Sequence, residues 1–443
     1  MNIVLSCRSS KVLVIIKSLF LILFFSCNAS AQLKTTESEI GLGWSNNSVN
    51  TVIFRNSALT SFKGSQYTAY YDPDGRMVLA KRQLNSKKWD KVVTAYSGNV
   101  KDAHNDISIA IDSQGYLHVS WDHHDTRLRY ARSKKPFSLE LGEEKAMTGV
   151  DEAKVTYPEF HNLPNGNLLF CYRSGASGRG NMIMKSYDVK TQLWTSLQNN
   201  LIDGENQRSA YWQMCVGEKG IYISWVWRES WDVSTNHDIC YAFSADGGKT
   251  WKKSTGEKYN LPITKETAEH AWEVPQSSSL INQTAMTLDE QGNPFIATYW
   301  DTKGVPQYKV VYLSGGKWNL ITTDFHVKPF TLGGGGTKRI PISRPEILVN
   351  KSMLYLLFRD EERDNKITLG YTHLQKTQWR IQDLSRLSVG QWEPNFDKEL
   401  WRDQKQLHIF SQNVTQADGE GLSKTTPQPV QILEVLQMPV PGE

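Results

Sequence analysis

Histidines that flank one predicted hairpin are the residues with the clearest chemical potential. The segment 104–124 has the sequence HNDISIAIDSQGYLHVSWDHH, in which the polar turn Asp112-Ser113-Gln114-Gly115 separates two runs of alternating apolar residues. This pattern predicts a β-hairpin. His104 lies about as far before the turn as His124 lies after it, so the spacing places His104, His123 and His124 at one edge of a sheet. Imidazoles gathered at such an edge suit acid–base chemistry or metal binding.

Only one of the two adjacent histidines is expected to face a site at that edge. Successive residues of a strand point to opposite faces, so His123 and His124 cannot both turn inward. We favour His124 for the site and interpret His123 as the more structural of the two, with a substrate contact left open for it.

Other polar side chains lie at matching distances from other predicted turns. If equivalent hairpin edges face the same rim of the fold, these side chains converge near a central channel, where such folds place ligand sites. The pairs, each around its own turn, are Tyr157 and Arg173, Tyr211 and Arg228, Arg344 and Arg359, and Asn282 and Asp301.

The set is rich in His, Tyr and Arg and poor in paired carboxylates. Ordinary glycoside hydrolysis requires two carboxyl groups across the scissile bond; Asp301 and Asp360 could serve, but each also suits a turn or a salt bridge. The set fits β-elimination of a uronic-acid polysaccharide better. There an arginine holds the carboxylate and stabilises the charge that develops when the C5 proton leaves, while Tyr or His acts as base and acid.

Seven polar turns, each followed by a strand-like run, organise the rest of the chain. Variable spacing between them indicates one repeated unit with loops of unequal length, and Ser244–Trp251 (SADGGKTW) matches the Asp-box pattern of propeller hairpins. We therefore predict an all-β, seven-bladed β-propeller, in which the early strand Val49–Phe54 completes the last blade and closes the ring. The turns are Asp72–Gly75, Asp112–Gly115, Pro164–Gly166, Glu218–Gly220, Asp289–Gly292, Asn350–Ser352 and Arg402–Lys405.

Residues 1–31 have the pattern of a secretory signal peptide, which leaves 32–443 as a single propeller domain. A basic segment, the apolar run Ser18–Phe25 and Ala29-Ser30-Ala31 follow in the expected order. The apolar run is too short for a membrane span. We expect a secreted or periplasmic protein, with a lipoprotein anchored at Cys27 as the alternative.

Charge and cysteine content exclude several classes of partner and site. Removal of 1–31 takes away three of the positive charges and lowers the net charge from +4 to +1, which argues against nucleic acid. Cys171, Cys215 and Cys240 then remain, with no metal-ligand spacing. We expect a monomer without a cofactor, and leave a structural divalent cation open.

A glycine run lies outside any phosphate-binding pattern. Gly333–Gly336 precedes Thr337, Lys338 and Arg339, but the order and spacing do not match a P-loop. We interpret it as a flexible loop over one face, with Lys338 and Arg339 available to an anionic substrate.

Three segments carry a resemblance to a known family. VKDAHNDISIAIDSQGYLHVSWDHH, VTYPEF with NLLFCYRSGASGRG, and RSAYWQM with ISWVWRE resemble the BNR-repeat polysaccharide lyases of propeller fold. That group includes ulvan lyases and lyases of the rhamnosyl-α-1,4-glucuronate linkage, and α-L-rhamnosidases of the same fold are similar to it. The resemblance covers most of the chain from about Gly41 to past Arg359.

The resemblance implies a secreted lyase acting on ulvan or on glucuronate-containing arabinogalactan or gum side chains. It implies acid–base roles for His104 and Tyr157, without deciding which is the base, carboxylate neutralisation by Arg173, and support from His124. We add His123, Tyr211, Arg228 and Arg344 as substrate-binding candidates. The stretch 44–48 lacks the histidine that the rhamnosidases are thought to use, so a rhamnosidase is the second hypothesis and a glycan-binding propeller the third.

Overall fold

The computed structural model describes residues 33–54, 56–376 and 378–439. The chain divides into a unit Met1–Gln32 and a unit Leu33–Glu443, and only the second contains described residues. The predicted signal peptide and Cys27 lie outside them. Among the helices that the structure describes, none has the length and hydropathy needed to cross a membrane.

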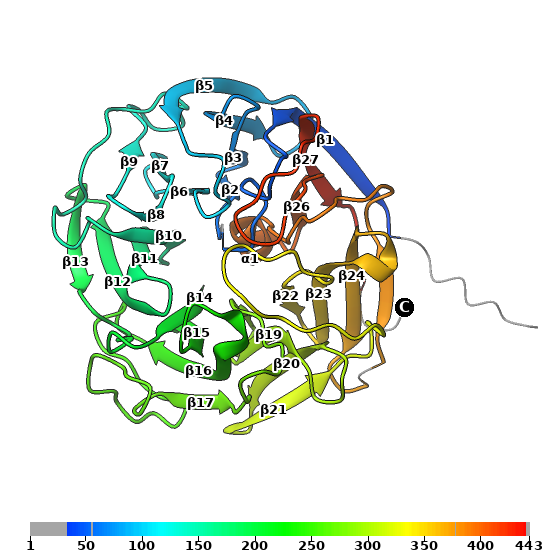
Figure 1. Cartoon of the computed structure of the whole chain (residues 1–443). Coiled ribbons are helices and arrows are strands. Elements are labelled where there is room, and N and C mark those ends of the chain that lie inside the picture. The colour runs from blue at the N-terminus through cyan, green and yellow to red at the C-terminus, as the bar shows by residue number, and fades with distance from the viewer. Residues whose placement is uncertain (1–32, 55, 377, 440–443) are drawn as a thin grey trace, which may run out of the picture. The chain divides into compact units, whose positions relative to one another are not determined.

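The second unit consists of seven blades of β-strands around a central axis (Figure 1). Blade one contains β2 (Leu59–Phe62), β3 (Ser65–Tyr71), β4 (Arg76–Gln83) and β5 (Asp90–Ser97). Blade two contains β6 (Ile107–Ile111), β7 (Leu117–Trp121) and β9 (Tyr130–Arg132). Blade three contains β10 (Val155–Asn162), β11 (Leu168–Ala176), β12 (Arg179–Asp188) and β13 (Leu193–Gln198). Blade four contains β14 (Ser209–Gly217), β15 (Gly220–Arg228), β16 (Asn236–Ser244) and β17 (Glu269–Trp272). Blade five contains β18 (Ala285–Leu288), β19 (Pro294–Trp300), β20 (Gln307–Ser314) and β21 (Lys317–Thr322). Blade six contains β22 (Glu346–Asn350), β23 (Met353–Asp360), β24 (Lys366–His373) and β25 (Arg380–Asp383).

The seventh blade joins both ends of the described chain. It contains β26 (Leu407–Gln412), β27 (Gln428–Val435) and β1 (Thr35–Gly43), and β1 pairs antiparallel with β27 from Thr35↔Val435 to Gly43↔Gln428. This pairing closes the ring and removes two sheet edges. The predicted seven-bladed propeller is therefore confirmed.

The identity of the closing strand was predicted wrongly. Residues 49–54 form turns and no strand, and their side chains are buried without the alternation of an edge strand, with Val49, Val52 and Ile53 at most 1% exposed. The backbone N–H of Ile53 donates to Glu393 Oε2 at 3.2 Å. Apolar residues there pack inside the ring instead of extending a blade.

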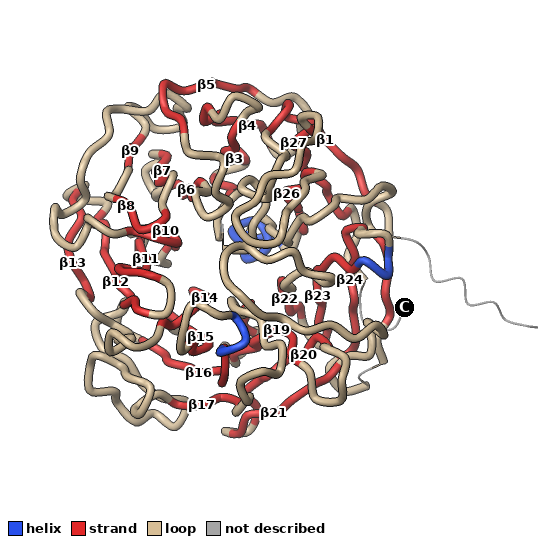
Figure 2. Tube along the Cα trace, viewed as in Figure 1, coloured by secondary structure: helices blue, strands red, loops and turns tan. Residues whose placement is uncertain are grey.

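Most of the predicted turns connect adjacent strands as expected. Asp72, Asp112 and Asp289 each accept hydrogen bonds through Oδ1 from the backbone N–H groups two and four residues further on, which explains the recurring sequence pattern. The turn predicted at Arg402–Lys405 is instead the end of a short helix, α1 (Lys398–Gln404), with Lys405 as its C-cap. Two further short helices, η1 (Val233–Thr235) and η2 (Glu361–Arg363), lie in the connections between β15 and β16 and between β23 and β24 (Figure 2).

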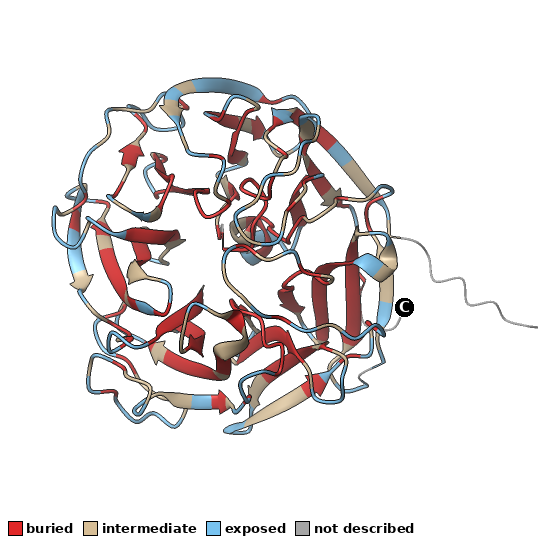
Figure 3. Ribbon diagram, in the orientation of Figure 1, coloured by how far each residue is buried: buried red, intermediate tan, exposed pale blue. Residues whose placement is uncertain are grey.

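Burial falls from the inner strands to the outer ones (Figure 3). Strands β7, β19 and β23 are buried at every position, whereas β5 is mostly exposed. In the Asp-box turn, Asp246 Oδ1 accepts from the backbone of Lys249 and Thr250, and Trp251 is fully buried. Packed blades therefore form a rigid frame whose inner strand ends position the polar residues described next.

Candidate active site

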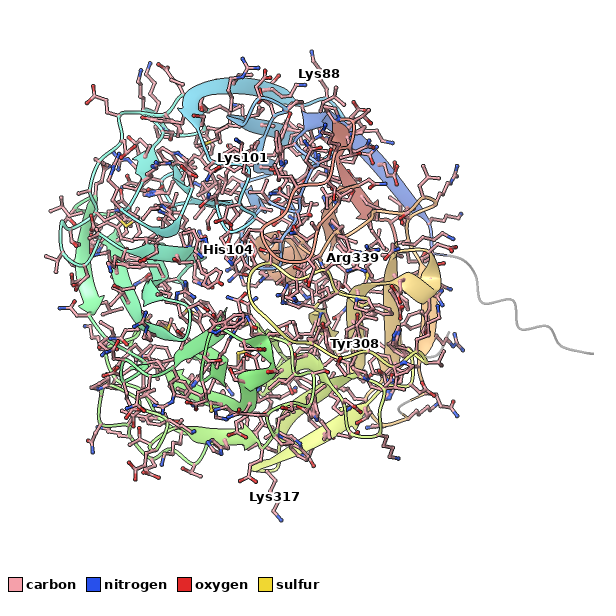
Figure 4. The ribbon with its side chains drawn as sticks, viewed as in Figure 1. Lys88, Lys101, His104, Tyr308, Lys317 and Arg339 are labelled. Atoms are coloured by element: carbon pink, nitrogen blue, oxygen red, sulfur yellow. The ribbon has the colours of Figure 1, made fainter. Side chains whose placement is uncertain are left out.

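One cavity of about 260 Å³ collects most of the residues singled out from the sequence. It lies where the inner ends of several blades meet, and His104 is seen at the inner side of the ring in Figure 4. Seven of the eight candidates line it: His104, His124, Tyr157, Arg173, Tyr211, Arg228 and Arg344.

The two histidines of the opening hairpin form a stacked pair held by one carboxylate. Their ring centroids are 4.0 Å apart. Asp102 lies between them, with Oδ1 at 2.8 Å from His104 Nδ1 and Oδ2 at 2.6 Å from His124 Nδ1. Glu420 Oε1 lies 3.3 Å from the same His104 nitrogen. Because these contacts all use Nδ1, the Nε2 atoms of both rings are left for other partners.

The carboxylates make His104 a strong candidate for an acid. Burial would lower the pKa of His104, but hydrogen bonds and charge from Asp102 and Glu420 outweigh it and raise the pKa to about 9. Burial would raise the pKa of Asp102, yet its two imidazole partners hold that pKa well below its usual range. His104 is thus an imidazolium at neutral pH.

His123 lies outside the cavity. Its buried ring contacts Ser120 Oγ at 3.1 Å and Thr126 Oγ1 at 3.3 Å, and burial lowers its pKa to about 4. Asp122 adopts a left-handed φ of 63° and ends β7, while His124 begins β8 (His124–Thr126) and pairs with Thr156 of β10. Substrate contact by His123 does not fit this placement, so His124 is the inward one.

Tyr157 reaches the cavity through a local break in its strand. The register of β10 on β11 shifts between Thr156 and Glu159, and Tyr157 has a φ of 58°, a conformation that a non-glycine residue adopts only when its surroundings enforce it. Its ring packs against Phe54 at 5.0 Å, and the Arg173 guanidinium lies 4.9 Å from the ring centroid.

Tyr211 lies between two arginines. Arg173 Nη1 donates to Tyr211 Oη at 3.4 Å, the Arg228 guanidinium lies 5.5 Å from the ring, and Ser177 Oγ is 3.0 Å from the same oxygen. Burial would raise the pKa of Tyr211, but Arg228 and Arg173 outweigh it and lower the pKa to about 8. For Tyr157, burial and the neighbouring Tyr211 outweigh the arginines and raise the pKa well above its usual range.

Arg344 lines the cavity but its charge is already neutralised. Its Nη1 donates to both carboxylate oxygens of Glu393, at 2.7 and 2.6 Å, and its Nε donates to the carbonyl of Asn282. The substrate contact predicted for Arg344 is therefore available only through the remaining face of the guanidinium. Asp301, suggested for a hydrolase, caps its own turn by accepting from Lys303 and Gly304.

Two loops cover the cavity. One is the glycine-containing loop between β21 and β22, coloured yellow in Figure 1, whose Gly335–Lys338 line the cavity together with Glu420 of the loop between β26 and β27. The loops are tied to each other: Thr337 N–H donates to Glu420 Oε1 at 2.9 Å, and Lys338 pairs with Asp418 at 2.7 Å. Lys338 is thus less available to substrate than we predicted.

Two groups of described residues have ligand atoms spaced for a metal ion: Asp102, His104 and His124, and His326, Asp360 and Glu362. In both groups the same atoms also hydrogen bond to each other. The expectation of a protein without a cofactor stays a prediction.

Sequence reasoning missed three residues of the site. Asp102 lies only two positions before His104, so a carboxylate near the histidine hairpin was a signal we did not use. Phe54, which stacks on His104 at 5.1 Å, lies in the segment predicted as the closing strand, and Glu420 lies in a loop; nothing in their local pattern indicates this position.

Comparison with known proteins identifies relatives of one kind. Residues 65–325 match the family described as BNR repeat-containing family member. The chain is 23% identical to an ulvan lyase of Alteromonas sp. (strain LOR), over 60% of this chain and 64% of that protein. It is 22% identical to "Ulvan Lyase-PL25" of Pseudoalteromonas sp. (strain PLSV), over 70% of each. The match thus spans less than two thirds of the first relative.

Solved structures agree on the fold. The crystal structure of polysaccharide lyase Uly1 superimposes with a TM-score of 0.68 at 15% identity, covering 91% of this chain and 100% of that one. A PL25 ulvan lyase bound to -[GlcA(1-4)Rha3S]- gives a TM-score of 0.66 at 18% identity, covering 89% and 94%.

Proposed function

Because the chain belongs to the BNR repeat-containing family, we propose that it is a polysaccharide lyase that cleaves a uronate-containing polymer by β-elimination. The observation that carries this proposal is a cavity in which two buried guanidiniums, Arg173 and Arg228, have no carboxylate partner among the described residues. Burying unpaired charge is costly unless an anion arrives. A polymer carboxylate meets that need.

The geometry supports a simple division of labour. Arg173 binds the uronate carboxylate and stabilises the negative charge that develops as the C5 proton leaves. His104, protonated through its carboxylate partners, donates to the departing O4. His124 keeps the His104 ring in place by stacking and shares Asp102 with it. The base is one of the tyrosines that contact Arg173.

The carboxylate content of the cavity argues against hydrolysis. Glu420 is the one carboxylate residue that lines the cavity in the described part of the chain, and it is engaged with Thr337 and His104. An acid and base pair of carboxyl groups across a glycosidic bond is therefore not supported, and the rhamnosidase alternative is not favoured.

Within the lyases, we propose a substrate of the ulvan class, with a rhamnose-α-1,4-glucuronate linkage. The named relatives are ulvan lyases, and one fold relative was solved with a glucuronate–sulfated rhamnose fragment. We also propose that the protein acts outside the cytoplasm, as predicted from residues 1–31, because such polymers are found there.

The test is a digestion of ulvan and of glucuronate-capped arabinogalactan by the purified protein. We expect products that absorb in the ultraviolet as 4,5-unsaturated uronates and whose mass is one water below that of a hydrolysis product. Saturated products, or free rhamnose without the ultraviolet band, would show a hydrolase. Binding of the polymer without any product would show a glycan-binding propeller.

A further inference from the structure

Two buried arginines beside Tyr211 lack a carboxylate partner among the described residues, and the reaction proposed above uses only one of them. Arg173 is 1% exposed and Arg228 6% exposed. Among the described residues, Arg173 donates to Tyr211 Oη and to the Gly175 carbonyl, and Arg228 donates to the backbone carbonyls of 230 and 231. Arg344, by contrast, has Glu393. A single substrate carboxylate neutralises one of these two guanidiniums and leaves the other without an anionic partner.

Tyr211 is placed to supply the second anion. Its hydroxyl oxygen accepts from Arg173 and contacts Ser177 Oγ, and both guanidiniums lie within 6.0 Å of its ring. The other charged or titratable groups that act on it are His104, a further positive charge, and Tyr157, whose ring centroid is 5.9 Å away. Every charged group that faces this oxygen therefore favours the phenolate.

Tyr157 is placed differently. Arg173 covers the face of its ring, and its hydroxyl makes no hydrogen bond with a described residue. Arg173 lowers the pKa of Tyr157, but burial and the neighbouring Tyr211 outweigh it and keep this phenol neutral. Its packing between Phe54 and Arg173 suits a side chain that shapes the site and aligns the guanidinium.

We propose, given the lyase reaction above, that Tyr211 and not Tyr157 is the base that removes the C5 proton. The C5–H bond breaks, the proton passes to the Tyr211 phenolate oxygen, and the electron pair forms the C4=C5 double bond. The C4–O4 bond breaks, and O4 takes a proton from His104 Nε2. Arg173 neutralises the uronate and Arg228 the phenolate, so each buried cation has one anion in the substrate complex.

The titration behaviour agrees with this assignment. Tyr211 has a pKa lowered to about 8 and His104 one raised to about 9, so a deprotonated base and a protonated acid coexist near neutral to mildly alkaline pH. We expect kcat/KM to rise as pH increases through about 8 and to fall above about 9.

The experiment compares Tyr211→Phe, Tyr157→Phe and the control Tyr222→Phe, because Tyr222 lines a second cavity and not the candidate active site. Tyrosinate formation is followed by ultraviolet difference absorbance in the free protein, and kcat by the unsaturated product. We expect the wild type to show one tyrosine titrating near pH 8, lost only in Tyr211→Phe. We expect the same variant to lose about 10³-fold in kcat, a full general-base contribution.

The proposal is overturned if the early titration persists in Tyr211→Phe, or if that variant changes KM while kcat and its pH profile remain. It is equally overturned if Tyr157→Phe removes the early titration. Arg228→Gln gives a second test with the tyrosine in place, because loss of that cation must move the titration to higher pH. The absorbance measurements need no substrate, so they stand even if the protein yields no unsaturated product and the lyase proposal fails.

Discussion

The central channel has two mouths, and they differ in how their charges are compensated. Strands β10 and β14 line both: Tyr157 and Tyr211 face the active-site cavity, whereas 160–162 and 214–217 face a second cavity on the opposite side. The second cavity is larger, about 600 Å³ against about 260 Å³. In the larger cavity Lys398 and Arg402 pair with carboxylates and the other two lysines are exposed, whereas two buried arginines of the smaller cavity have no carboxylate partner among the described residues.

At the opposite mouth, two cations form ion pairs with carboxylates. Arg402 forms ion pairs with Glu399 and Asp403, and Lys398 pairs with Glu346 at 3.3 Å. Acidic and basic side chains along this cavity are nearly equal in number, so it attracts neither sign of charge. The comparison teaches that unpaired buried charge, and not volume, distinguishes the end of this channel that we propose to be reactive.

Among the substitutions that test this comparison, removal of Arg173 should cause the largest loss of activity. Arg173→Gln keeps a hydrogen-bond donor but leaves the developing carboxylate charge without its cation, so we expect kcat/KM to fall by about 10³-fold. Steady-state kinetics on the polymer measures it, with thermal unfolding as a check that the variant is folded. A folded Arg173→Gln variant with activity within a few-fold of wild type would remove the basis of the comparison.

Loss of Asp102 should have a smaller effect, and one that depends on pH. In Asp102→Asn the amide cannot accept from both imidazoles, while Glu420 still contacts His104. The pKa of His104, now about 9, should fall, so the alkaline limb of the activity profile moves to lower pH. We expect a loss of about 10- to 100-fold in kcat at the wild-type optimum. An unmoved alkaline limb would assign that limb to another group.

The sequence predicted the hairpin side of this site better than its loop side. In the structure Ile107 pairs with Trp121, and the same register continued outward sets His104 opposite His124, as the turn arithmetic required. Local alternation of side chains carries that information. Alternation also predicted that only one of His123 and His124 faces the site, and the structure places His124 in the cavity and His123 outside it.

Residues supplied by distant loops were not predictable in this way. Glu420 reaches His104 from a loop of the seventh blade, and Phe54 does so from the segment that we took for the closing strand. Their positions depend on closure of the whole ring by β1 and β27, a long-range pairing that no periodicity in either segment encodes. The fold class was predictable because each blade repeats a local pattern.

The smallest effect should come from the same charge deletion at the opposite mouth. Arg402→Gln removes a guanidinium as Arg173→Gln does, but its side chain is 45% exposed, and those of its partners Glu399 and Asp403 are 20% and 59% exposed. Water screens such pairs, so we expect a stability loss of about 1 kcal/mol or less and kcat/KM within about two-fold of wild type, given no contact with substrate. Thermal unfolding and kinetics on the same polymer measure both. A large loss of activity in a folded Arg402→Gln variant would show that the polymer, or its release, uses both mouths, and the division between a reactive and a compensated end would be wrong.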